Sequence, residues 1–366
     1  MEFKQSFLEK MVMNANFWKN KTVMITGHTG FKGSWLSLIL KKFGANVIGF
    51  SKNIPTNPSM YEVANIKKGM INIFGDINDS KKIYQVLVKY KPDIVFHMAA
   101  QAIVRESYKD PLETFSTNIL GTANILEAIR QIDNVKVAIM VTSDKSYRVK
   151  NDHSKYSEDD PMGGYDPYSS SKGCAELVIS AYRNSFFNIK NKNDPTSIAS
   201  VRAGNVLGGG DWGADRLIPD IIRGIQKKEI IQIRNPKSIR PWQFVLDPLS
   251  GYISLAEKMW EDRKQFSKGW NFGPTNSKEE TVEWIVKFLK EQLNEEIDLK
   301  INNSIQPHEE KYLRLDCSKA INQLGWESKI NLEKTLLWTM NWYTEYLKSN
   351  NMEEFTKKQI DEYMRL

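Results

Sequence analysis

Short apolar segments alternate with longer amphipathic segments over the first half of the chain. The short segments predict strands, and the amphipathic segments, with apolar positions three or four residues apart, predict helices. The expected strands lie at residues 21–26, 46–50, 71–77, 92–100, 135–143 and 196–206. The expected helices lie at residues 34–44, 79–90, 118–131 and 168–184. Strands that alternate with helices over short connections indicate an α/β fold, with a doubly wound parallel sheet covered on both faces.

The pattern changes after residue 206. Glycines, tryptophans and loops dominate the next segment, amphipathic helices follow from residue 278, and the last two helices, at 332–348 and 353–364, carry aromatic residues at helical spacing. We therefore expect a smaller second domain for substrate binding. The expected division is a dinucleotide-binding domain of residues 18–206 with 243–272 returning to it, a substrate-binding domain of 207–242 with 273–348, an N-terminal appendage of 1–17 and a C-terminal helical tail of 349–366.

Composition narrows the classes of partner. The formal net charge of +7 suits an anionic small molecule, whereas the basic residues are scattered among acidic ones, so we expect no nucleic-acid partner. No stretch approaches the roughly 20 apolar residues of a membrane span, and none near the start resembles a signal peptide. We expect a cytoplasmic protein without a membrane partner. Cys174 and Cys317 are the two cysteines, which excludes a disulfide scaffold, and the four irregularly spaced histidines argue against a metal site.

The segment GHTGFKG stands between the first expected strand and the first expected helix. Gly27 permits a tight turn, Gly30 lets the backbone approach a pyrophosphate, and Gly33 permits close packing of the helix on the strand. The N-terminus of the helix then faces the phosphates. An empty glycine-rich turn is the alternative, but the strand–turn–helix context favours a Rossmann-type dinucleotide site.

The end of the second expected strand leaves the choice of dinucleotide open. NAD sites commonly place an acid about twenty residues after the glycines, but this strand ends in Phe50, Ser51 and Lys52. On physical grounds Ser51 and Lys52 favour a 2′-phosphate and hence NADP. Asp76, at the end of the third expected strand, is placed either to reach the adenine or to cap the next helix.

Tyr168 and Lys172 occur in YSSSK, directly after Asp166 and Pro167. The aspartate suits a helix N-cap and the proline the first turn. The spacing of four places the phenol and the ammonium on one helix face, where positive charge favours phenolate and makes Tyr168 a plausible base. Tyrosine and lysine also occur four apart by chance in many helices.

A hydroxyl, a carboxylate and an amine follow one another in VTSDKSY, as Ser143, Asp144 and Lys145, after the apolar run at 135–140. Taken alone, this heptapeptide is typical of a surface turn with a local ion pair. At the end of a strand in a dinucleotide-binding fold, the same three groups can serve acid–base chemistry.

Several motifs together carry a resemblance. TGHTGFKG, HMAAQ, TNILGT, YSSSK and RAGNVLG resemble the extended short-chain dehydrogenase/reductase family. The longer strings VTSDKSY, DPMGGYDPYSSSKGCAEL, GGGDWGADRLIPD, IRPWQFVLDPLSGY and YLRLDCSKA resemble its CDP-glucose 4,6-dehydratase family. The resemblance covers about residues 17–338.

The resemblance implies a hydro-lyase that converts CDP-glucose to CDP-4-keto-6-deoxyglucose, in deoxysugar biosynthesis for surface polysaccharide. A tightly held NAD takes hydride from sugar C4, water leaves from C5 and C6, and the hydride returns to C6. Ser143, Tyr168 and Lys172 form the hydride-transfer triad. Asp144 is the candidate acid for the departing C6 hydroxyl and Lys145 the candidate base for the C5 proton. Relatives that act on dTDP-glucose have Asp-Glu at these two positions.

The resemblance also implies binding residues and a homodimer. The expected cofactor contacts are Gly27, Thr29, Gly30, Phe31, Gly33, Asp76, Ile77, Ala99, Ala100, Asn118, Tyr168 and Lys172. The expected substrate contacts are Asn205, Arg216, Arg240, His308 and Tyr312, with a structural ion pair as the alternative for Arg216. His97 is expected to shape the cofactor pocket more than to shuttle protons. Helices 118–131 and 168–184 would form the dimer bundle, although the apolar residues of the first could equally face its own sheet.

Two other functions remain open. A 4,6-dehydratase or 4-epimerase acting on a dTDP-, GDP- or UDP-linked sugar would use the same scaffold, but the epimerases carry small residues where Asp144 and Lys145 stand. A non-catalytic dinucleotide sensor is the alternative from another class, and such proteins typically lose Tyr168 or Lys172.

Overall fold

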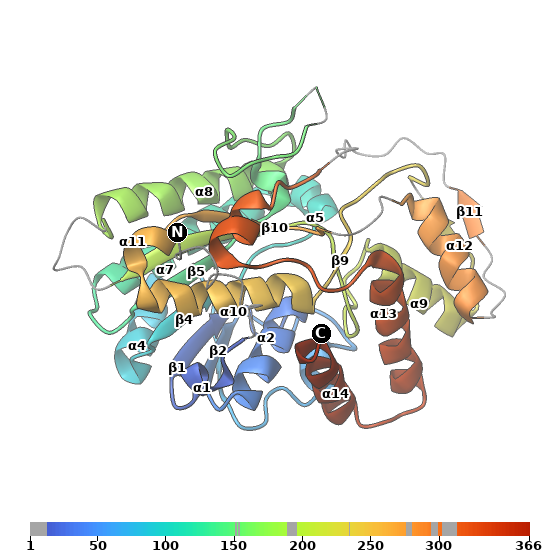
Figure 1. The fold of residues 1–366 in the computed structure, drawn as a ribbon, viewed down its shortest axis with the longest axis horizontal. Helices are drawn as coiled ribbons and strands as arrows, with labels where there is room; N and C mark the ends of the chain where they lie inside the picture. Colours follow the sequence, from blue (N-terminus) through green and yellow to red (C-terminus); the bar gives the residue numbers. More distant parts are fainter. Residues whose placement is uncertain are drawn as a thin grey trace, which may run out of the picture.

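The computed structural model describes residues 13–150, 152, 154–188, 196–233, 235–275, 280–293, 299–301 and 313–366, and these ranges contain a seven-stranded sheet. Its strands are β1 (Thr22–Thr26), β2 (Asn46–Ser51), β3 (Ile71–Phe74), β4 (Ile94–His97), β5 (Val137–Val141), β6 (Ser197–Ala203) and β10 (Gly269–Phe272). The order is β10-β6-β5-β4-β1-β2-β3, with every neighbouring pair parallel (Figure 1). The part from β3 to β6 has the strand order of dinucleotide-binding sheets. The predicted fold class is confirmed.

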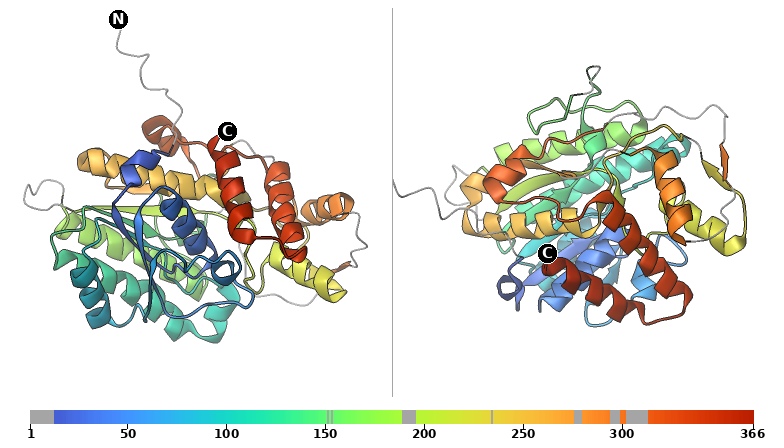
Figure 2. Two further views of the ribbon diagram at one scale, coloured as in Figure 1. Left: turned by 90° about the horizontal axis from the view of Figure 1, so that it is seen from below. Right: turned by 45° about the vertical axis from the view of Figure 1, so that its right-hand side comes forward.

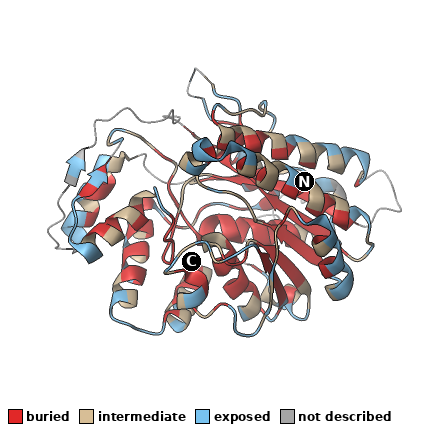
Figure 3. Cartoon of the chain, turned by 180° about the vertical axis from the view of Figure 1, so that it is seen from behind, coloured by how far each residue is buried: buried red, intermediate tan, exposed pale blue. Residues whose placement is uncertain are grey.

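Helices cover both faces of this sheet. One face carries α2 (Phe31–Lys42) and α10 (Leu246–Glu261), and the other carries α4 (Ser80–Tyr90), α7 (Gly121–Arg130) and α8 (Pro167–Ser185). Successive side chains of a strand point to opposite faces. In β1, Val23 and Ile25 therefore join the first core, while Met24 joins the second. The central strands β4 and β5 are buried along their whole length, so their residues are almost all apolar (Figure 3).

The helix expected at 118–131 differs in the structure. The chain forms α6 (Pro111–Phe115), then a π-helical turn at Ser116–Leu120, and only then α7. Asn118 lies in this turn, and its side-chain amide bonds outside the helix, to the backbone of Gln101 and to the Ser171 hydroxyl. The hydrophobic period did not predict this π-helical turn. Asn118 bonds Gln101 and Ser171 in other segments, and such contacts leave no mark on the local sequence pattern.

The smaller elements lie to one side of the sheet. Two short pairs, β7 (Val206–Leu207) with β9 (Gln243–Phe244) and β8 (Ile231–Ile233) with β11 (Leu299–Ile301), join α9 (Leu217–Lys227) and α12 (Val282–Leu293). Figures 1 and 2 show α9, α12 and β11 grouped away from the sheet. From β9 the chain runs through α10 to β10 and so returns to the sheet. The remaining short elements are α1 (Ala15–Trp18), α3 (Met60–Val63), α5 (Val104–Lys109), α11 (Arg263–Phe266), η2 (Asp144–Ser146) and η3 (Ala320–Leu324).

The chain ends in two helices, α13 (Leu332–Leu347) and α14 (Met352–Met364), close to the predicted positions. Helix α14 lies against α2, where Lys42 pairs with Asp361 at 2.8 Å (Figure 2). Within the described ranges, none of the helices combines the length and apolar character needed to cross a bilayer.

Candidate active site

A cavity of about 350 Å³ lies at the carboxyl ends of β5 and β6, next to the glycine turn that follows β1. Ligands of open parallel sheets bind at this edge. Its wall is built from the first turn of α2, the segment after β5, the start of α8 and the segments around α9 and β8. Eight of the predicted site residues line it together: Phe31, Ser143, Asp144, Lys145, Tyr168, Asn205, Arg216 and Arg240.

Helix α8 presents Tyr168 and Lys172 as the sequence predicted. Asp166 caps the helix by accepting a hydrogen bond from the Ser169 amide (2.9 Å), and Pro167 occupies the first turn. Both functional side chains are buried. Burial raises the pKa of Tyr168 to about 12, and a hydrogen bond with Ser143 acts in the opposite direction. Burial also lowers the pKa of Lys172 to about 7. Burial therefore disfavours the phenolate that we expected the lysine to favour.

The turn after β5 carries Ser143, Asp144 and Lys145 into the cavity. Asp144 is buried, and one of its oxygens accepts a hydrogen bond from the Ser143 hydroxyl (3.0 Å), while no described residue donates a hydrogen bond to the other. Burial raises the pKa of Asp144, which favours the protonated form that an acid needs. Gly204 makes room for this carboxyl, because a Cβ there would lie 3.2 Å from Asp144 Oδ2. The surface-turn interpretation is therefore wrong for Asp144.

The glycine turn has the geometry of a dinucleotide cradle. Gly27 has a φ of +76°, and a Cβ on it would lie 2.8 Å from the amide nitrogen of Ala99. A Cβ on Gly33 would lie 2.1 Å from the carbonyl oxygen of Gly27, whereas one on Gly30 would meet nothing closer than 3.4 Å. The first and third positions thus require glycine for packing, and the second leaves open space beside the helix N-terminus. Thr29 fixes the turn to the end of β2 through the Asn53 carbonyl (2.7 Å).

Lys52, at the end of β2, is paired with two carboxylates. Its ammonium lies 2.9 Å from Asp76 Oδ2 and 3.0 Å from Glu113 Oε1. Asp76 does not cap α4, since Asp79 accepts the hydrogen bond from the Lys82 amide. Acidic charge therefore surrounds the position where a 2′-phosphate would need positive charge, so the residues fit NAD better than NADP.

Asn118 and His97 are predicted pocket residues that are buried but do not line the cavity. The Asn118 amide accepts from the Gln101 nitrogen (2.9 Å) and donates to the Ser171 hydroxyl (2.8 Å), which joins the loop after β4 to α8. Both ring nitrogens of His97 contact threonine hydroxyls, of Thr26 and Thr122. Burial lowers the pKa of His97 to about 3, so a neutral ring that shapes the pocket is favoured over a proton shuttle. Ile77 is buried in the core between the sheet and helices α4, α7 and α8, and Ala99 and Ala100 follow β4.

Three of the predicted substrate contacts line the cavity. Arg240 is buried in its wall, and Asn205 lies just after β6. Arg216 lines the cavity and also pairs with Asp211 at 2.7 Å, so both interpretations of this arginine hold. The two remaining predicted substrate contacts, His308 and Tyr312, lie outside the described residues.

Comparison with known proteins agrees with this geometry. The family model described as GDP-mannose 4,6 dehydratase matches residues 24–338. A CDP-glucose 4,6-dehydratase of Salmonella typhimurium is 48% identical over 354 residues, which are 96% of this chain and 99% of the relative. This chain belongs to the GDP-mannose 4,6-dehydratase family. A more distant relative, a dTDP-glucose 4,6-dehydratase of Haemophilus influenzae, is 27% identical over 88% of this chain and 97% of its own.

Solved structures support the fold of this dehydratase. A dTDP-glucose 4,6-dehydratase from Bacillus anthracis in complex with NAD superposes with a TM-score of 0.72 at 20% identity, over 89% of this chain and 97% of that chain. MoeE5 in complex with UDP-glucose and NAD gives 0.74 at 23% identity, over 89% and 99%. These TM-scores show that the fold is shared.

Sequence reasoning missed three groups of this dehydratase site. Lys32, inside the glycine motif, lines the cavity, and burial lowers the pKa of its ammonium to about 8. Arg105 of α5 reaches the rim and lies 3.8 Å from Asp215. Glu176 lies one turn beyond Lys172 and forms a buried ion pair. The signals were visible as a lysine among glycines and a glutamate four residues after the YSSSK lysine.

Proposed function

We propose that this chain is a CDP-glucose 4,6-dehydratase, a hydro-lyase that converts CDP-glucose to CDP-4-keto-6-deoxyglucose and water. The observation that carries the proposal is the convergence of Ser143, Asp144 and Lys145 on one cavity with Tyr168. The 48% identical relative with this activity supports the choice of nucleotide and sugar. An epimerase needs no acid and base for elimination, so the buried Asp144 beside Lys145 argues against that alternative.

The residues divide the reaction between them. Tyr168, hydrogen-bonded to Ser143, takes the proton of the C4 hydroxyl as hydride leaves C4, which gives a 4-keto sugar. When bound, NAD supplies the hydride acceptor at C4, the hydride donor at C6 and a positive ring that favours the phenolate. The ketone acidifies C5, so Lys145 removes the C5 proton while Asp144 protonates the C6 oxygen, and the C6–O bond breaks to release water. Return of a hydride to C6 and a proton to C5 completes a reaction without net oxidation.

The test is direct. Wild-type protein is incubated separately with CDP-glucose, dTDP-glucose, UDP-glucose and GDP-mannose, each with NAD, and the 4-keto-6-deoxy products are measured by mass spectrometry as the loss of one water. We expect turnover of CDP-glucose to exceed that of the other substrates. Turnover of another nucleotide sugar in preference would contradict the base, and formation of a C4 epimer without loss of water would contradict the reaction.

The cofactor is expected to be NAD. Lys52 is already neutralised by Asp76 and Glu113, and a 2′-phosphate would add negative charge beside two carboxylates. We expect NAD to support turnover at lower concentration than NADP, measured by titrating each dinucleotide at fixed CDP-glucose. Asp76→Ala should reduce the difference between the NAD and NADP concentrations that support turnover. Lys81→Ala, on the exposed start of α4, is the control and should leave that difference unchanged. A wild-type preference for NADP would contradict this assignment.

We propose that the protein is a homodimer. Most apolar residues of α7 face the sheet of their own chain, with Ile125, Leu126 and Ile129 buried. This was the alternative to a dimer bundle for the helix expected at 118–131. Support for the dimer comes instead from exposed apolar side chains around α7 and α8, since large exposed patches commonly mark interfaces. The exposed residues are Leu112, Leu120, Tyr165, Leu177 and Phe186.

Leu177 tests this surface, because its side chain is 60% exposed at the middle of α8. Leu177→Glu is expected to shift the protein from dimer to monomer in sedimentation-velocity runs, since a buried unpaired carboxylate opposes association. Leu347→Glu, at the exposed end of α13, should leave the dimer intact. A wild-type monomer at micromolar concentration would exclude the dimer.

We propose two domains, one for each of the two molecules that the enzyme binds. Residues 18–206 with 243–272 would bind the dinucleotide, and 207–242 with 273–348 the nucleotide sugar. Cys174 and Cys317 are free thiols, which supports a cytoplasmic location where such substrates are made. The product would serve deoxysugar biosynthesis for surface polysaccharide.

A further inference from the structure

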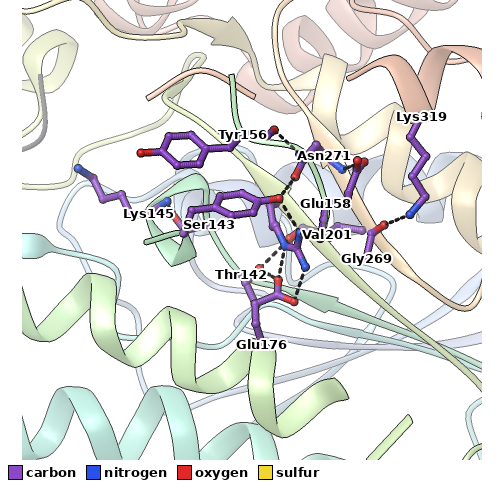
Figure 4. A network of polar contacts seen from close by, with 12 residues as sticks. Thr142, Ser143, Lys145, Tyr156, Glu158, Glu176, Val201, Gly269, Asn271 and Lys319 are labelled. Carbon is purple, nitrogen blue, oxygen red and sulfur yellow. Dashed lines mark hydrogen bonds and ion pairs between the residues drawn. The ribbon is translucent and has the colours of Figure 1, made fainter. Parts of the chain in front are cut away.

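The turn that carries Ser143, Asp144 and Lys145 is tethered at both ends to one ion pair. On the near side, the Thr142 hydroxyl donates to Glu176 Oε1 (2.5 Å). On the far side, Arg202 Nη1 donates to the Tyr147 hydroxyl (2.5 Å). Glu176 and Arg202 themselves form a bidentate pair, with Nε to Oε1 at 2.7 Å and Nη2 to Oε2 at 2.8 Å (Figure 4).

The tether continues to the edge of the sheet. The Tyr147 hydroxyl, which accepts from Arg202, donates to Asn271 Oδ1 (2.7 Å) on β10. Asn271 in turn donates to the Tyr156 carbonyl (2.9 Å), and the rings of Tyr147 and Tyr156 stack with centroids 5.1 Å apart. Figure 4 draws this network as dashed lines that run from Thr142 and Glu176 to Asn271 and Tyr156, with Lys145 to the left. Four separate segments, α8, β6, β10 and the loop after η2, thus meet at this turn.

A buried ion pair of this kind is poor evidence for stability. Side-chain exposure is 4% for Arg202 and 2% for Glu176, and the cost of removing both charges from water can exceed their attraction. What the pair does provide is geometry, because two parallel N–H···O bonds fix the relative orientation of both groups. The third guanidinium nitrogen, Nη1, donates at one end of the turn, and the carboxylate Oε1 accepts at the other.

Glu176 also lies on the catalytic face of its helix. Tyr168, Lys172 and Glu176 are four residues apart in α8, so their side chains follow one another along one side. Arg202 lies on β6, three residues before Asn205. The pair therefore connects α8, which presents the phenol, with β6, which ends at the cavity. The acid–base turn is bonded to both members of the pair through Thr142 and Tyr147.

We propose that the Glu176–Arg202 pair is a positioning device for elimination and hydride transfer, holding Thr142 and Tyr147 so that residues 143–146 keep their place against Tyr168. This role rests on the proposed function. Neither residue lines the cavity, so both act through the turn and not on the substrate. A misplacement of about 1 Å in a catalytic group can cost on the order of 10²-fold in rate.

Two variants test the device at different points. Glu176→Gln keeps the shape but removes the charge and one acceptor of the bidentate pair, and Tyr147→Phe removes only the hydroxyl on the far side. We expect each to lower kcat on the order of 10- to 100-fold with KM within about 3-fold. Because both act through one network, the double variant should lose much less than the product of the two single losses.

The matched control is Glu257→Gln. Glu257 is also buried and accepts from Trp18 Nε1 (2.6 Å) and the Asn14 amide (3.1 Å), but it joins α1 to α10 and does not line the cavity. We expect its kcat to stay within about 2-fold of wild type at a temperature where all variants are folded. An equal loss of kcat in this control, or losses that multiply in the double variant, would overturn the positioning role.

Hydrogen exchange supplies a readout that needs no substrate. The Thr142 amide bonds the Val201 carbonyl (2.9 Å), and the Ser146 amide bonds the Ser143 carbonyl (3.1 Å). We expect both amides to exchange faster in Glu176→Gln and Tyr147→Phe and at the wild-type rate in Glu257→Gln. Unchanged exchange would overturn the proposal. If wild-type protein fails to dehydrate CDP-glucose while exchange rises as expected, the proposed function fails and the tether stands.

Discussion

Tyr168→Phe is expected to lower the rate of C4 oxidation by about 10²- to 10⁴-fold, the contribution of a positioned general base. The phenol is buried beside Ser143 in the cavity wall, and phenylalanine has no group that can accept the proton of the C4 hydroxyl. The measurement is single-turnover formation of reduced cofactor after CDP-glucose is added to protein with NAD. Binding of CDP-glucose, measured by calorimetry, should stay within a few-fold, because phenylalanine keeps the shape of the ring.

The control for this variant is Tyr165→Phe. Tyr165 stands three residues earlier, is exposed and does not line the cavity, so its loss of a hydroxyl should leave oxidation at the wild-type rate. Near-normal turnover by Tyr168→Phe would remove this residue from the mechanism and leave Ser143 as the group nearest to the C4 oxygen.

Lys145→Ala is expected to separate oxidation from elimination. Ser143, Tyr168 and Lys172 are untouched by the change, so C4 oxidation should proceed and we expect reduced cofactor to build up with the 4-keto sugar bound. Removal of the C5 proton should slow by on the order of 10²-fold or more, since its base is gone. The measurement is exchange of the C5 proton with solvent deuterium, followed by mass spectrometry.

Lys150→Ala is the control for Lys145. Lys150 belongs to the same loop but pairs with Asp160 at 2.7 Å and does not line the cavity. If Lys145→Ala exchanges the C5 proton as fast as Lys150→Ala and wild type, the base is another group, and Lys145 serves only as a charge beside Asp144.

Local sequence patterns predicted much of the fold, the glycine turn and the placement of Tyr168 and Lys172 on one helix. The glycine motif, the N-cap at Asp166 and the four-residue spacing of Tyr168 and Lys172 all depend on neighbours within a turn, and the structure has each of them as predicted. The parallel sheet followed from the alternation of strands and helices, because a crossover helix is the usual way to join parallel strands.

Other features depend on residues far apart in the chain. The sequence around Lys52 predicted a ligand for a 2′-phosphate, but Asp76 and Glu113 lie beside its ammonium in the structure. The net charge of a site depends on every segment that contributes a side chain to it. The pKa of Tyr168 depends on distant residues in the same way, since burial by other segments raises it to about 12.

The sequence by itself determined most of the elements and the dinucleotide turn, because periodicity and capping act over a few residues. The acid–base groups were named as candidates by the family resemblance. Only the tertiary structure decided which of these groups share a cavity, that Asp144 is buried, and that Glu176 reaches Arg202 twenty-six positions away. The physical reason is that burial and ion pairing are properties of packed surroundings. Those surroundings exist only once α8, β6, β10 and the turn after β5 have come together.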